Sequence, residues 1–140
     1  MRQLTRQDCF DKVWNHFVVE KNPLSFELSG VGDRLCLYRG LNGEKCAIGI
    51  LIPDDKWNPD CENQSPVQAL ANCGIKDYFH DEVFEALDGI YFLRDLQGAH
   101  DIVCYTFAST GSTKSTIETS LRNLAKKWKL KIQDSLTGPQ

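Results

Sequence analysis

The chain lacks a long hydrophobic run. None of its segments approaches the ~18 consecutive apolar residues that a membrane-spanning helix needs. Residues 1–10 also lack the apolar core of a secretory signal peptide. Both absences predict a protein without a membrane partner that stays in the cytoplasm where it is made.

Basic charge is also scarce. The sequence holds 16 Lys and Arg against 19 Asp and Glu, which gives a net charge of −3. Nucleic-acid-binding domains are usually basic, so a nucleic acid polymer is not expected as the partner. The 140 residues predict a single compact domain, with a core over about residues 5–132 and a frayed tail at 133–140.

Spacings typical of metal ligands are missing. The six cysteines have at least nine residues between neighbours, and no C-x-x-C or H-x-x-H occurs. Structural zinc sites usually draw on such close pairs, so neither a metal nor a cofactor is predicted. Six cysteines in 140 residues are also fewer than in small disulfide scaffolds, where cysteine exceeds about 8–10%. This density favours reduced, buried thiols.

Apolar residues at helical spacing predict four or five helices. Thr5 and Asp8 form a weak capping box, and a stripe from Phe10 to Val18 follows until Asn22-Pro23 ends the helix. Further helices are expected from Ser65-Pro66 to Gly74, from Asp81 with a break or weak point at Asp88-Gly89, from Ile90 to about Val103, and after a Ser115 cap, with a loop within residues 105–114. In the helix after Ile90, Arg94, Gln97 and Asp101 share a polar face beside His100.

Residues 35–57 form the segment around which these helices are expected to pack. Asn42-Gly43 is a strong turn pattern, and it predicts a hairpin that pairs residues 35–39 with 44–48. Residues 24–34 are expected as an edge strand or extended arm. The apolar run 46–52 fits either a buried strand or a buried helical turn. The predicted fold is therefore α+β, mainly helical, with the helices around a small β-hairpin.

Three motifs resemble those of a group of small uncharacterised bacterial and phage or prophage proteins. They are C-x-Y-R-G at 36–40, G-x-K-C-A-x-G-x-L-I-P-D at 43–54, and L-x-D-L-Q-x-x-H-D at 93–101. The resemblance covers about residues 5–130. It implies a phage or mobile-element origin, which would place the protein in a host cytoplasm, and it implies no activity.

Aromatic and charged side chains in the central segment suggest a binding site. Its members are Tyr38, Arg39, Lys45, Asp54, Asp55 and Trp57. Arginine can grip a phosphate or carboxylate, an aromatic ring can stack on a flat group, and the aspartates could contact a ribose or donor group. These residues, with the resemblance, favour a non-enzymatic binding protein, with a counter-defence or host-modulating role. It would sequester a small anionic, nucleotide-like ligand or engage a host protein. The plainer alternative is that the aromatics pack and the charges are solvated.

Two other functional classes remain open. A small hydrolase could use His100-Asp101 with a metal ion, or Cys46 as a nucleophile. However, His100 falls on an apolar helix face, and burial would raise the pKa of the Cys46 thiol. A protein–protein module acting through self-association, as a homo-oligomer, is the third alternative. Exposed aromatic area at Trp57 or Trp128 would support that module.

Overall fold

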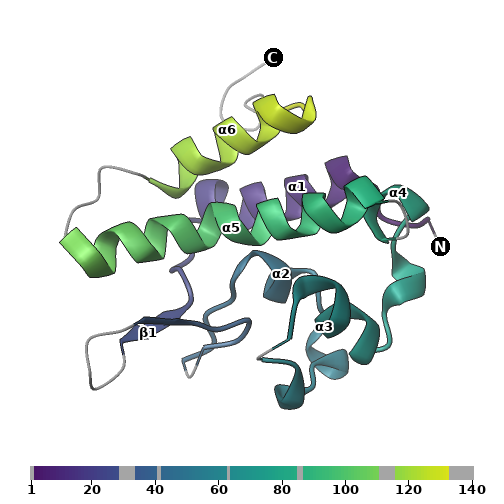
Figure 1. Ribbon diagram of the computed structural model, residues 1–140, viewed down its shortest axis with the longest axis horizontal. Helices are drawn as coiled ribbons and strands as arrows, with labels where there is room; N and C mark the ends of the chain where they lie inside the picture. Colours follow the sequence, from purple (N-terminus) through teal and green to yellow (C-terminus); the bar gives the residue numbers. More distant parts are fainter. Residues whose placement is uncertain are drawn as a thin grey trace.

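Helix α5, Leu87–Thr110, runs through the middle of the computed structural model (Figure 1). The structure describes residues 2–28, 34–40, 42–62, 64–84, 87–110 and 116–132. Helix α6, Ile117–Trp128, lies along one side of α5, and α2, Ala47–Ile50, and α3, Pro66–Asn72, lie along the other. Helix α1, Arg6–Trp14, packs against α2 and α6. The molecule is thus organised around one long helix.

Short helical elements connect these helices. They are the π-helical turn η1, Asn15–Val19, the 3-10 turns η2, Asp54–Lys56, η3, Pro59–Cys61, and η4, Lys76–Tyr78, and helix α4, Asp81–Phe84. Helix takes up 63% of the described residues, which confirms that the chain is mainly helical. No helix in the described part of the chain combines the length and apolar character needed to cross a membrane.

The prediction of an α+β fold around a central hairpin is wrong. Residues 35–39 and 44–48 do not pair as two strands, and between them only Arg39 and Lys45 form an isolated bridge. Two three-residue segments, β1, Phe26–Leu28, and β2, Arg34–Cys36, pair antiparallel within the described residues. A pair this short does not make a layer of the fold, so the helices form the core without a sheet.

The apolar run 46–52 forms a helical turn in place of the second hairpin strand. Ile48 and Gly49 are both buried although they are adjacent. Adjacent residues of a strand point to opposite faces, whereas a turn of helix lets both pack inwards. Cys46 caps this turn, because its sulfur accepts a hydrogen bond from the Gly49 N–H at 3.4 Å. The turn before this run still forms, because the Gly40 N–H donates to the Glu44 carbonyl at 2.7 Å and the Cys46 N–H to the Tyr38 carbonyl at 3.3 Å. Packing inside the domain therefore prevents only the longer strand pairing that was predicted beyond the turn.

The predictions for α1 and α3 are confirmed at their N-termini. Thr5 and Asp8 form the capping box of α1. The expected apolar face of α1 and η1 is buried at Phe10, Val13, Trp14 and Phe17. Ser65 caps α3, and Pro66 is its first residue. Local capping chemistry was sufficient to locate these starts.

Helices α5 and α6 correct the predicted boundaries. Helix α5 continues through Gly89 and ends at Thr110, inside the predicted loop. Its buried side chains Phe92, Leu93 and Leu96 each contribute about 1.5–3 kcal/mol by burial, more than the ~1 kcal/mol cost of a helical glycine. Thr116 caps α6 by accepting from the Thr119 N–H. Ser115 and the tail 133–140 lie outside the described residues.

We predict opposite effects for alanine at two helical glycines. A Cβ at Gly49 would lie 2.0 Å from the Tyr38 carbonyl oxygen, whereas a Cβ at Gly98 would meet nothing within 4 Å. Gly49→Ala should lower the free energy of unfolding by about 1–3 kcal/mol or more through this clash. Gly98→Ala should raise it by about 0.5–1 kcal/mol through helix propensity. Urea unfolding followed by circular dichroism measures both, and equal effects would contradict the packing of α2 against Tyr38.

Candidate functional site

The backbone at Tyr38 and Arg39 is held by one carboxylate. Glu62 accepts the Tyr38 N–H at 2.7 Å with one oxygen and the Arg39 N–H at 2.9 Å with the other. Burial raises the pKa of the Tyr38 hydroxyl, which donates a hydrogen bond to the Gln64 carbonyl. The loop that begins at Tyr38 is therefore tied to the segment between η3 and α3.

The structure brings Arg39 and Lys45 together around Asp54. The Arg39 Nη1 lies 2.6 Å and the Lys45 Nζ lies 3.3 Å from the same Asp54 oxygen. The hydrogen bond from Arg39, with a further contribution from Lys45, lowers the pKa of the Asp54 carboxyl. Arg39 also donates to the carbonyls of Gly49, at 3.3 Å, and of Ile52. The Arg39 cation thus closes the C-terminal end of α2.

Trp57 joins this cluster and Asp55 does not. The Trp57 ring lies edge-on to Tyr38 with a centroid distance of 6.4 Å, and the Arg39 guanidinium lies 5.6 Å from the Trp57 ring. Asp55 is an exposed residue of η2 and has no contact with the cluster among the described residues. Five of the six predicted residues therefore meet, but their aromatic faces and charges are directed at one another.

A second polar network crosses α5 around a buried histidine. His100 is fully buried, and its Nε2 lies 3.0 Å from the backbone N–H of Ser25. Because a backbone N–H can only donate, Nε2 is the acceptor and the ring proton sits on Nδ1. Nδ1–H then donates to Asp101 Oδ1 at 2.9 Å. The same oxygen accepts from Gln97 Nε2 at 2.9 Å, and Gln97 Oε1 accepts the Ile48 N–H at 3.1 Å.

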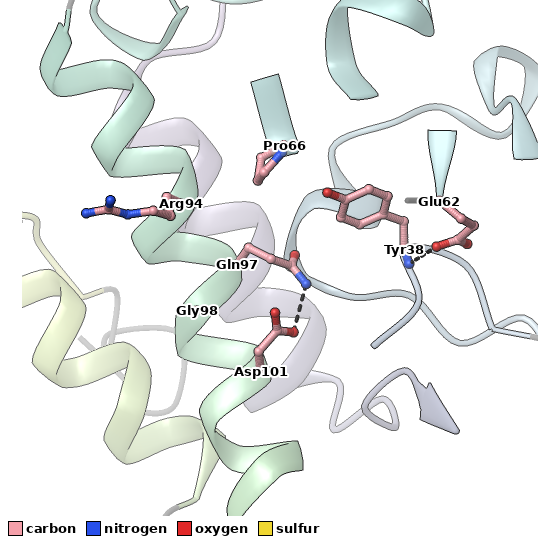
Figure 2. Close-up of a pocket in the computed structure, with 7 residues that line it drawn as sticks. All are labelled: Tyr38, Glu62, Pro66, Arg94, Gln97, Gly98 and Asp101. Atoms are coloured by element: carbon pink, nitrogen blue, oxygen red, sulfur yellow. Dashed lines mark hydrogen bonds between the residues drawn. The ribbon is translucent and has the colours of Figure 1, made fainter. Parts of the chain in front are cut away.

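The open side of this network is a cavity of about 320 Å³, which we name the α5 pocket (Figure 2). Its lining residues are Tyr38, Glu62, Pro66, Arg94, Gln97, Gly98 and Asp101. Gln97 and Asp101 project from α5 towards Tyr38 (Figure 2). Arg94 points away from them, and its guanidinium lies 4.7 Å from the Tyr91 ring. Asp101 therefore carries the charge that faces Tyr38 across the pocket, while the Glu62 carboxylate is turned to the backbone of Tyr38 and Arg39.

The geometry gives little support to either hydrolase alternative. Both ring nitrogens of His100 have partners inside the protein, so neither is open to a substrate. Within the described ranges, no three His, Cys, Asp or Glu side chains gather where they could hold a metal ion. Cys46 is fully buried, and burial raises the pKa of its thiol to about 12. Its sulfur serves as the cap of α2.

Several pocket residues were absent from the predicted binding site, and one of them, Asp101, was predicted only as the partner of His100 in a hydrolase. Gln97 and Asp101 were expected on one polar face of a helix, and their i, i+4 spacing is what brings them together. Glu62 lies in a polar connection whose sequence carries no local pattern that points to Tyr38, 24 positions away. Gly98 belongs to the third motif, yet nothing in that motif indicates that the glycine faces open space.

Arg39→Ala should destabilise the protein more than Lys45→Ala. Loss of Arg39 removes the side-chain donor to the Ile52 carbonyl just after α2, while the Gly49 carbonyl keeps the Ile52 N–H, and we expect the free energy of unfolding to fall by about 1–3 kcal/mol. Lys45 is partly exposed and pairs with the exposed Asp54, so its loss should change that free energy by about 0–1 kcal/mol. Urea denaturation separates the two cases. A small, equal change in both variants would contradict the role of Arg39 at the end of α2.

Cys46 should resist alkylation while the protein is folded. With a thiol pKa of about 12, its thiolate fraction at pH 8 is at least about a hundredfold below that of a free cysteine. Iodoacetamide followed by mass-spectrometric peptide mapping measures the labelling rate. Cys9, equally buried and with its pKa also raised to about 12, is the internal control, and labelling in urea defines the unfolded rate. Rapid labelling of Cys46 alone would support the nucleophile.

Comparison with known proteins adds no assignment to this geometry. No protein-family model, no curated protein and no solved structure matches the chain. The resemblance to small bacterial and phage proteins therefore stays a prediction. The functional argument rests on the contacts around the α5 pocket.

Proposed function

We propose that this protein binds a small molecule with a cationic, hydrogen-bond-donating group in the α5 pocket. The observation that carries the proposal is the Asp101 carboxylate, which lines the pocket with 32% of its side chain exposed. Amines, amidines and guanidines are the chemical class that fits this group. A volume of about 320 Å³ lies at the small end of the range for ligand pockets, about 300–1,000 Å³.

Asp101 is held in position before any ligand arrives. Its Oδ1 accepts from His100 and from Gln97, each at 2.9 Å, and Oδ2 accepts no hydrogen bond from any described residue. His100 is fully buried and Gln97 is 7% exposed, so the partners of Asp101 have little freedom to move. A charged acceptor that is oriented in advance binds a donor with less loss of side-chain entropy.

The charge around Asp101 favours a cation. Glu62 adds a second negative charge at the pocket wall, with both of its oxygens bonded to backbone N–H groups, and the Arg94 guanidinium is directed towards Tyr91. The Tyr38 hydroxyl donates to Gln64, which leaves its ring as an apolar surface beside the carboxylates. An apolar wall with a few placed polar groups is the usual composition of a small-molecule site.

Two larger hollows suit a ligand less well. In one, of about 400 Å³ between α5 and α6, Asp95 already accepts from Lys127 and Trp128. In the other, of about 380 Å³, Arg2 lies 2.6 Å from Asp8. Asp95 and Arg2 are thus paired within the protein, and the other charged residue of the second hollow, Lys12, is a cation that would repel such a ligand.

The anionic ligand expected from the sequence would have to displace Asp54 from Arg39 and Lys45. A protein-binding role through aromatics has less support, because Trp57 and Trp128 are both half-buried and packed. The mobile-element origin and the counter-defence role remain predictions from resemblance. Their test is separate from that of the α5 pocket.

Thermal unfolding with matched probes tests the proposal. Small amines and guanidines should raise the Tm of the unaltered protein, whereas carboxylates and phosphates of similar size should not. At ten times its Kd, a ligand adds about 1.4 kcal/mol to the stability of the folded state, which corresponds to a shift of roughly 3 °C or more. Asp101→Asn should abolish the shift, because it removes the charge and keeps an oxygen that can accept from His100 and Gln97.

Two control variants make the result specific. Asp55→Asn removes an exposed carboxylate outside the pocket and should leave the shift unchanged. Lys45→Ala tests the predicted anion site. The proposal is wrong if the cationic probes leave the Tm of the unaltered protein unchanged. It is also wrong if they raise the Tm of Asp101→Asn by the same amount as that of the unaltered protein. A shift by phosphates that disappears in Lys45→Ala would assign binding to the Arg39–Lys45 cluster.

A further inference from the structure

Two buried cysteine thiols are in contact beside the α5 pocket. The Cys73 thiol donates to the Cys61 sulfur, with 3.8 Å between the two Sγ atoms. Cys61 is 1% exposed and Cys73 is 6% exposed. Cys61 ends η3, and Cys73 is the residue that closes the C-terminus of α3. Both thus lie at the ends of short elements.

A disulfide between these residues needs only a short movement. The sulfur atoms of a disulfide are about 2.05 Å apart, so the two Sγ atoms must approach each other by roughly 1.8 Å. The segment that would be closed carries Glu62 and Pro66, two residues of the pocket wall. Cross-linking this segment would restrict the wall that faces Asp101.

We propose that Cys61 and Cys73 are a site of reversible oxidation by a low-molecular-weight disulfide. Cys73, the more exposed thiol, loses its proton to solvent and attacks one sulfur of the reagent, which releases the first small thiolate. Cys61 then loses its proton and attacks the Cys73 sulfur of the mixed disulfide, which releases the second. Two electrons pass to the reagent, and its two thiolates take up the two protons.

The surroundings of the pair determine the rate of this reaction. Burial, and next the hydrogen bond with Cys73, raise the pKa of the Cys61 thiol to about 11. Little thiolate is therefore present at neutral pH, and we expect oxidation over minutes to hours. As long as the pH is below this pKa, the rate of the second step should rise roughly tenfold for each unit by which the pH is increased.

Non-reducing peptide mapping of the folded protein tests the site. The protein is incubated with glutathione disulfide at pH 8, quenched with acid and digested. The expected product has lost two hydrogens, contains a cross-linked peptide joining Cys61 to Cys73, and has a higher Tm than the reduced protein because the cross-link restricts the unfolded chain. Dithiothreitol should reverse both changes.

Single substitutions identify the partners. Cys61→Ser and Cys73→Ser should each abolish the loss of two hydrogens, whereas Cys9→Ser, a change at another buried cysteine, should not. In Cys61→Ser the mixed disulfide should persist on Cys73. If the unaltered protein yields only mixed disulfides, or a cross-link between other cysteines, the proposal is overturned whether or not the variants fold.

Discussion

The structure depends on two side chains of α5 that accept hydrogen bonds from backbone N–H groups without a partner in their own segment. The Ser25 N–H, just before β1, binds His100, and the Ile48 N–H, in the first turn of α2, binds Gln97. Donors at a helix start have no partner within the helix, and a buried donor left unpaired costs about 1–3 kcal/mol. Helix α5 supplies these acceptors and thereby joins segments that are 75 and 49 positions away.

The same requirement for acceptors gives the α5 pocket its charge. His100 keeps its acceptor nitrogen towards Ser25 only if its proton faces Asp101, so the carboxylate is part of the structural network. Glu62 acts similarly on the opposite wall, where it accepts two backbone N–H groups. Two carboxylates required by the fold therefore lie around one cavity, and this supports a ligand that donates hydrogen bonds.

Local patterns and long-range contacts contributed differently to the outcome. The capping of α1 and α3 followed from residues within four positions of each other, as did the shared face of Gln97 and Asp101. The prediction of a central hairpin was wrong because a turn pattern carries no information about the segments that pack against the residues after the turn. The Tyr38 carbonyl, so close that Gly49 has no room for a Cβ, and the burial of Ile48 favour helix at that position.

By itself, the sequence determined a mainly helical chain, the apolar faces of its helices and most of their starts, because these depend on neighbours along the chain. It also brought Tyr38, Arg39, Lys45, Asp54 and Trp57 into one hypothesis, and the structure places them together. Only the tertiary structure decided how their groups are used. Whether a charge faces a ligand or another residue depends on Glu62, Gly49 and Asp101, which reach their positions only when distant segments pack.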